Sequence, residues 1–133
     1  MGQTHGHETR TILVVDDDPA TVEIVARMLQ SAGYAVLKAN SASECLDWLA
    51  RERVHLAVLN LNMPGVGGLE LYEQMQASPR WRAIPVVVIT ARDDADMRQR
   101  AAAQGVKEVL TKPFTKQDLL RCVREHLPAT FVS

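Results

Sequence analysis

Several residue types are scarce in this 133-residue chain, and each scarcity excludes a class of protein. Aromatic residues make up 5% of the sequence, and Cys45 and Cys122 are the only cysteines. No apolar run approaches the roughly 20 residues that cross a bilayer, so no membrane span is expected. The formal net charge of −1 provides no basic field for direct binding of nucleic acid or of an anionic membrane. The first ten residues are polar, without the apolar core of a signal peptide, which predicts a cytoplasmic location.

The cysteines and the N-terminal histidines carry little functional signal. Cys45 and Cys122 are isolated on separate expected helices, which favours free, buried thiols over a disulfide. His5 and His7 lie within residues 1–10, which are expected to form a flexible tail. The two imidazoles could bind a transition metal weakly, but a frayed chain end is the favoured interpretation.

Apolar segments and amphipathic segments alternate along the rest of the chain. Short, apolar and largely β-branched runs predict buried strands at residues 12–15, 35–38, 54–61, 84–90 and 106–111. The segments between them have helical spacing of apolar residues and carry recognisable start and stop signals. These signals are Asp18 with Pro19, Gly33, Ser41 with Glu44, Asp94, Gly105, and Thr115 with Asp118.

This alternation predicts the fold class. Five strand–helix pairs imply an α/β fold, a doubly wound five-stranded parallel sheet with right-handed crossovers and helices on both faces. One domain over residues 11–127 accounts for all five pairs. Residues 128–133 are expected to be a C-terminal tail or the stub of a linker to an output domain. In such sheets, functional groups gather beyond the carboxyl ends of the strands.

The polar residues at these strand ends form an unusual set. Five of them follow or end a predicted strand: Asp16, Asp17, Asn60, Thr90 and Lys112. Carboxylate and amide oxygens suit Mg²⁺, which keeps several waters and can bridge to a phosphoryl group. A hydroxyl and an ammonium group can hold the remaining phosphoryl oxygens, because phosphoryl transfer depends mainly on positioning and charge neutralisation.

Four segments that contain these residues resemble the response-regulator receiver family of two-component signalling. They are ILVVDDDP, LNLNMPGVGGLEL, VVVITA and LTKPF, in this order and spacing. The resemblance covers roughly residues 11 to 127. It implies the flavodoxin-like (β/α)5 receiver fold and a function in a phosphorelay, with no enzymatic activity of the chain's own.

The resemblance also implies a metal site and a phosphoryl site. Asp16 and Asp17 match the acidic pair that binds Mg²⁺, and Asn62 matches the position whose backbone carbonyl is a further ligand. Thr90 and Ala91 match the hydroxyl residue that moves toward the phosphoryl group and its small neighbour. The phosphoryl-contacting lysine of the family matches Lys112, and its peptide bond to the following proline is commonly cis in this family.

Two positions depart from the family pattern. The phosphoacceptor aspartate falls on Asn60, and the aromatic switch residue of the fifth strand falls on Val109. A carboxamide is not a nucleophile toward a phosphoryl donor, so no acyl phosphate is expected at Asn60. The amide also removes one negative charge, and Mg²⁺ is therefore expected to bind more weakly than in an ordinary receiver.

Two explanations of Asn60 remain open. It is either a natural loss, which gives a pseudo-receiver working without phosphate, or an engineered Asp→Asn change in an ordinary phosphorylatable receiver. The other strand-end residues are intact, which favours a recent or deliberate change. Val109 favours a natural loss, because a designer would have no reason to alter both positions.

The expected function is that of a protein-interaction switch module. The partners implied by the resemblance are a histidine kinase, a phosphotransfer protein or an output domain, and a homodimer is left open. A flavodoxin-like cofactor binder on the same fold is the alternative from another class. It is disfavoured because Asp16, Asp17 and Asp18 would repel a phosphate group unless a metal intervened.

Overall fold

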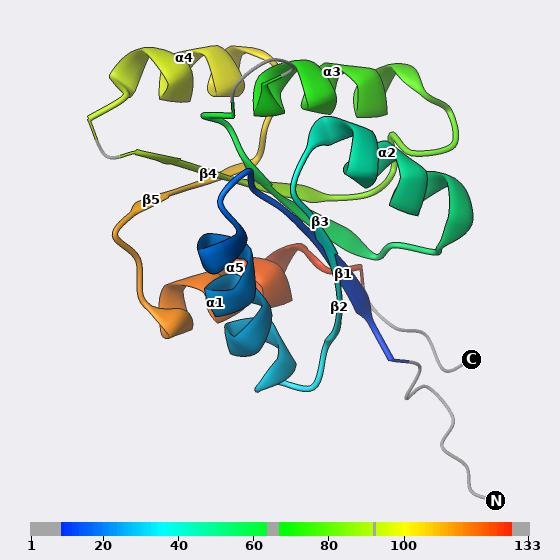
Figure 1. The fold of residues 1–133 in the computed structure, drawn as a ribbon. Coiled ribbons are helices and arrows are strands. Elements are labelled where there is room, and N and C mark those ends of the chain that lie inside the picture. The colour runs from blue at the N-terminus through cyan, green and yellow to red at the C-terminus, as the bar shows by residue number, and fades with distance from the viewer. Residues whose placement is uncertain (1–8, 64–66, 92, 129–133) are drawn as a thin grey trace, which may run out of the picture.

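The computed structural model describes residues 9–63, 67–91 and 93–128, and Figure 1 shows its arrangement. Within these residues, five parallel strands form one sheet in the order β2-β1-β3-β4-β5. The strands are Thr11–Val15 (β1), Ala35–Ala39 (β2), Leu56–Asn60 (β3), Val86–Ala91 (β4) and Glu108–Lys112 (β5). Most of the predicted N-terminal tail, and residues 129–133 of the predicted C-terminal tail, lie outside the described residues.

Helices cover both faces of the sheet, as the alternating pattern predicts. They are Pro19–Gln30 (α1), Ala42–Arg51 (α2), Gly68–Ala77 (α3), Ala95–Ala103 (α4) and Lys116–His126 (α5). Helices α1 and α5 lie on one face, and α2, α3 and α4 lie on the other (Figure 1). The predicted doubly wound α/β fold is therefore confirmed. Over the part of the chain that the structure describes, no helix has the length and apolar character needed to cross a membrane.

The sheet separates two apolar clusters. Leu13 and Leu59 point into the cluster beneath α2, α3 and α4, whereas Ile12 and Val58 point into the cluster beneath α1 and α5. This is the two-sided burial that makes parallel strands apolar throughout. Cys45 lies in the first cluster and the second cysteine in the other, so both thiols are free and buried, as predicted.

Side-chain caps explain where helices α1 and α5 begin. The Asp18 carboxylate accepts hydrogen bonds from the Ala20 N–H and the Thr21 hydroxyl, at 3.2 and 2.7 Å. The Thr115 and Asp118 side chains form a reciprocal capping box at the start of α5. Each bond satisfies a helix group that would otherwise lack a partner.

Three of the observed strands begin two residues later than predicted. Strand β3 covers 56–60 instead of 54–61, β4 begins at Val86 instead of residue 84, and β5 begins at Glu108 instead of residue 106. Pro85 has no N–H group to donate to a neighbouring strand, although its carbonyl oxygen still accepts from the Ala57 N–H at 3.0 Å. A prediction based on apolar side chains therefore made the strand longer than the segment that is paired through its backbone.

Candidate functional site

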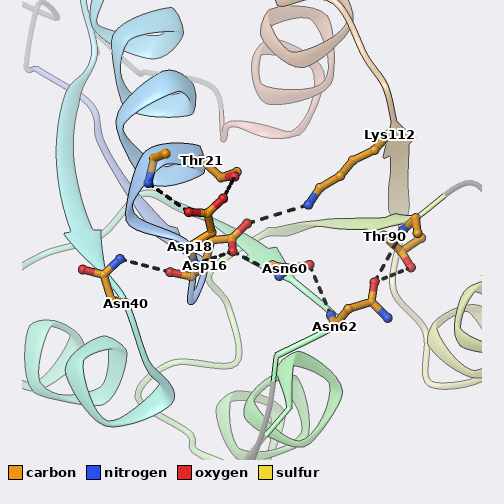
Figure 2. Close-up of polar contacts among 10 residues, drawn as sticks. Asp16, Asp18, Thr21, Asn40, Asn60, Asn62, Thr90 and Lys112 are labelled. Carbon is orange, nitrogen blue, oxygen red and sulfur yellow. Dashed lines mark hydrogen bonds and ion pairs between the residues drawn. The ribbon is translucent and has the colours of Figure 1, made fainter.

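Four of the five polar residues predicted from the sequence lie together at the carboxyl edge of the sheet (Figure 2). Asp16 directly follows β1, and Asn60 is the last residue of β3. Thr90 lies near the end of β4, and Lys112 is the last residue of β5. Asp16, Asn60 and Thr90 are the buried polar residues of the part of the chain that the structure describes, which is why their partners decide the chemistry of this edge.

Asp16 is the buried carboxylate at the centre of the site, with 3% of its surface exposed. Its Oδ1 atom accepts hydrogen bonds from the Asp18 N–H at 3.0 Å and from the Asn60 amide at 3.2 Å. The Lys112 ammonium lies 4.0 Å from its Oδ2 atom. Burial raises the pKa of Asp16, while the Asp18 N–H and the Lys112 charge lower it. Because burial outweighs these effects, the pKa of Asp16 lies above its usual value.

The Asn60 carboxamide uses both of its polar atoms. Its Nδ2 group donates to Asp16, and its Oδ1 atom accepts from the Asn62 N–H at 3.2 Å. The reverse orientation would place the amide oxygen against a carboxylate and the amide nitrogen against an N–H donor, so only one orientation is compatible with the partners. A carboxylate in this place would face Asp16 without a proton between them. The N–H end of the amide dipole thus faces the Asp16 carboxylate. If residue 60 were an aspartate, the two carboxylates would need a cation between them.

A second hydrogen-bonded group joins the loop after β3 to the start of α4. The Asn62 Oδ1 atom accepts from the Thr90 hydroxyl at 3.0 Å and from the Ala91 N–H at 3.4 Å. Its amide nitrogen donates to Asp94 at 2.9 Å. Asp94 also caps α4 through the Met97 N–H, and these contacts, the Met97 N–H first, lower the pKa of Asp94. The Thr90 hydroxyl is therefore bound to Asn62, not to Asn60.

The sequence did not predict these Asn62 side-chain contacts. The resemblance assigned only a backbone role to Asn62, and Asp94 was identified only as the start of a predicted helix. Two other contacts were also not foreseen: the Asn40 amide donates to the Asp16 carbonyl oxygen at 3.1 Å, and the Asp16 carboxylate accepts from the Asp18 N–H. Loop asparagines and acidic helix caps are common signals for turns, but they do not specify a partner about 30 residues away.

Asp17 and Val109 lie at the margins of the site. Asp17 is exposed, and its negative charge contributes to the raised pKa of Asp16. Val109 is half-buried on β5, in register with Val88 of β4, and packs against the cluster beneath α2, α3 and α4. A small apolar residue therefore occupies the position at which the resemblance leads one to expect a large aromatic ring.

The donor set at this edge fits Mg²⁺ only in part. The Asp16 and Asp17 carboxylates and the Asn62 carbonyl would supply the oxygen atoms that a hard cation prefers. However, the group that faces the buried Asp16 carboxylate from β3 is the amide nitrogen of Asn60. A cation would have to displace this donor, so the residues present fit a weaker site than three anionic oxygens would make.

Gly68 presses the first turn of α3 against the end of β3. A Cβ atom on Gly68 would overlap the Asn60 carbonyl oxygen and lie 2.8 Å from the Leu61 Cα atom. These are backbone atoms of a buried strand and cannot move aside easily. The absence of a side chain at this position lets α3 approach the strand that carries Asn60.

Comparison with known proteins identifies the relatives of this chain. The family model described as "Response regulator receiver domain" matches residues 12–124. The chain is 38% identical to the response regulator MprA of Mycobacterium leprae, over 90% of this chain and 51% of that protein. It is 36% identical to an uncharacterized 14.6 kDa protein of Leptolyngbya boryana, over 86% of this chain and 88% of that protein. It thus spans about half the length of the mycobacterial relative.

Solved structures show the same architecture. The chemotaxis protein CheY4 of Vibrio cholerae superposes with a TM-score of 0.83 at 27% identity, over 90% of this chain and 100% of that one. A response regulator receiver protein from Pseudomonas putida superposes with a TM-score of 0.83 at 28% identity, over 90% and 98% of the two chains. The chain therefore shares its overall fold with these two solved receiver structures.

Proposed function

Because the chain belongs to the response regulator receiver domain family, we propose that it is a receiver module of two-component signalling that works without accepting a phosphoryl group. Its partners are a histidine kinase, a phosphotransfer protein or an output domain. Relatives such as MprA of M. leprae are about twice as long as the region matched here, which is consistent with an output domain as one such partner. The site at the carboxyl edge then serves to hold a conformation.

The observation that carries this proposal is the bonding of Asn60. Its carboxamide is 5% exposed, donates to Asp16 and accepts from Asn62. The neutral amide therefore meets the hydrogen-bonding needs of this buried position. An aspartate here would place a second carboxylate close to that of Asp16. Unpaired buried charges are costly, and the amide removes the need for a cation between the two side chains.

The chemistry of the amide excludes the usual reaction at this position. An aspartate oxygen attacks the phosphorus atom of a donor and forms an acyl phosphate. The Asn60 amide oxygen is uncharged, and its nitrogen lone pair is delocalised into the carbonyl group, so neither atom attacks phosphorus. Mg²⁺, when bound by Asp16 and Asp17, would supply charge neutralisation only.

The switching residues are also held away from the acceptor position. The Thr90 hydroxyl is bound by Asn62, and Val109 lacks a large ring that could exchange between a buried and an exposed position. The equilibrium between conformers is therefore set by partner binding, since a ligand shifts such an equilibrium only through its different affinity for the two states. A partner that prefers one arrangement of the β4–α4 region would supply that difference.

Intact-mass spectrometry after incubation with Mg²⁺ and acetyl phosphate tests the proposal. We expect no phosphoryl group on residue 60 of the native protein, and the gain of one phosphoryl group in the Asn60→Asp variant. The variant is the matched positive control, because it only replaces the side-chain NH₂ group with oxygen and keeps Thr90 and Lys112. A native protein that gains a phosphoryl group at residue 60, or an Asn60→Asp variant that gains none, would contradict it.

A further inference from the structure

A second cluster of ionisable side chains lies at the opposite, amino edge of the sheet. Glu108 is the first residue of β5, and Glu125 and His126 lie in the last turn of α5. One possible ligand atom from each of these three side chains lies within 4.8 Å of the others. The His126 Nε2 atom is 3.1 Å from the Glu108 Oε1 atom.

The fold brings these residues together from distant points of the sequence. Helix α5 returns antiparallel to β5, so the last turn of the helix lies beside the first residue of the strand (Figure 1). The carboxyl end of a helix carries a partial negative charge from its unpaired carbonyl groups. Two carboxylates and this helix end bring negative charge to the imidazole, and Arg121 and Arg124 of the same helix offset part of it.

We propose that Glu108, Glu125 and His126 bind a divalent transition metal ion of the Zn²⁺ type. Imidazole nitrogen and carboxylate oxygen are both zinc ligands, whereas Mg²⁺ prefers oxygen ligands alone. Two carboxylates and a neutral imidazole also balance the charge of a divalent cation. The 3.1 Å separation between the His126 and Glu108 ligand atoms is close to the edge of about 3.3 Å in a tetrahedron with metal bonds of about 2.0 Å.

Metal binding would replace two existing contacts, the 3.1 Å hydrogen bond between His126 and Glu108, whose proton the ion would displace, and an ion pair of Glu125. The Arg121 guanidinium lies 3.5 Å from Glu125, and both side chains are about half exposed, at 50% and 53%. Exposed ion pairs of this kind contribute about 0–1 kcal/mol, so a cation can displace the guanidinium. The Glu108 and His126 side chains are more recessed, at 25% and 24% exposure. Their partial burial strengthens electrostatic attraction to an ion.

The cluster borders a cavity that is open to solvent and lies near the buried thiol of Cys122. His126 forms part of the wall of a cavity of about 290 Å³ that Tyr72 and Lys107 also line, so solvent and ions can reach the imidazole. The buried Cys122 thiol lies one helical turn before His126. Burial, and then the charge of Glu108, raise the pKa of Cys122. The thiol also forms a side-chain hydrogen bond with Glu108, which an ion bound to this carboxylate would displace or share.

Zinc titration by isothermal calorimetry tests the proposal in a protein that carries His5→Ala and His7→Ala, which removes the two histidines of the N-terminal segment. We expect one Zn²⁺ per chain, with binding weakened roughly 100-fold by His126→Gln or Glu125→Gln, because even an outer partner of a metal ligand contributes about 10–100-fold. Glu52→Gln is the matched control, since Glu52 is an exposed glutamate outside the cluster and should leave the affinity unchanged. A Zn²⁺ affinity in the His126→Gln or Glu125→Gln variant equal to that of the parent protein would overturn the proposal.

Amide NMR spectra with Co²⁺, a paramagnetic substitute for Zn²⁺, locate the ion independently of the variants' stability. We expect selective broadening of amides near Glu108 and near Glu125 and His126. Broadening centred on Asp16 and Asn60 would place the ion at the other edge of the sheet and overturn the assignment. The native fold of each variant is checked in the same spectra, and the result does not depend on whether Asn60 accepts phosphate.

Discussion

The carboxyl and amino edges of the sheet carry polar clusters that are built in opposite ways. At the carboxyl edge, Asp16 is 3% exposed and is bound by the neutral Asn60 amide. At the amino edge, Glu108 and His126 are about a quarter exposed and Glu125 about half exposed. The first cluster satisfies its buried carboxylate with protein donors alone. The second brings two carboxylates and an imidazole together near solvent.

Burial decides whether a polar cluster of this kind depends on an added ion. A buried carboxylate must be matched by a donor or a cation, and Asn60 provides the donor. Half-exposed carboxylates are stabilised by water and need no such match. The carboxyl edge should therefore respond strongly to changes of one atom, and the amino edge weakly until a metal ion is added.

Gly68→Ala should have the largest effect, because the new methyl group would overlap backbone atoms at the end of β3. We expect the free energy of unfolding to fall by roughly 3 kcal/mol, measured by urea denaturation. Gly67→Ala is the matched control. Its methyl group would lie 2.8 Å from Glu70 Oε1, the end of a flexible side chain, so a loss below about 1 kcal/mol is expected. Equal losses in both variants would show that the approach of α3 is not restrictive.

Asn60→Asp should have the next largest effect on stability when Mg²⁺ is absent. The change removes the hydrogen bond to Asp16 and places a second carboxylate beside it. We expect a loss of about 1–3 kcal/mol, and recovery when Mg²⁺ is added, because an ion that binds only the folded state stabilises it. Thermal unfolding with and without Mg²⁺ measures both. A variant as stable as the native protein without Mg²⁺ would contradict the role of the amide as a substitute for the cation.

Asp16→Asn should change how stability depends on pH. The pKa of Asp16 is raised by burial, so the folded protein holds this proton to a higher pH than the unfolded chain does. Stability contributed by the protonated form is present at low pH and is lost as the pH rises through the folded pKa. The variant should therefore gain stability relative to the native protein over that pH range, in the absence of Mg²⁺. Urea denaturation across the acidic range measures this, and a constant difference at every pH would contradict it.

Glu125→Gln should have the smallest effect without metal. Its ion pair with Arg121 is half exposed, so we expect a change below about 0.5 kcal/mol in the free energy of unfolding. Addition of Zn²⁺ should then separate the two proteins, because only the native cluster keeps both carboxylates. A large loss in the metal-free protein would show that the amino edge, like the carboxyl edge, depends on a buried charge.

The sequence predicted the parts of the molecule that follow from local periodicity. Apolar β-branched runs predicted the strands, and Asp18, Thr115 and Asp118 predicted helix starts that the structure confirms. The meeting of Asp16 and Asn60 followed from the rule that parallel strands end at a common edge. These inferences need only the order and spacing of residues.

Other contacts depend on loop geometry and on how a helix returns to the sheet. The Asn62–Asp94 bond joins residues 32 positions apart, and the Glu108–His126 contact joins residues 18 apart. Neither pair has a fixed spacing that a sequence pattern would reveal. The starts of β3, β4 and β5 were also mispredicted, because apolar residues precede the first residue of each strand.

The backbone pairing at the end of β3 also bears on how the protein ages. Asparagine deamidates when the following backbone nitrogen attacks the side-chain carbonyl, closes a five-membered imide and releases ammonia; water then opens the ring to an aspartate or isoaspartate. Here the Leu61 N–H is bound to the Ile89 carbonyl oxygen at 2.9 Å, so this nitrogen would have to leave its partner before it could attack. Asn60 is thereby protected from conversion during storage. A long-lived molecule would keep its amide and would not acquire a phosphorylatable side chain with time.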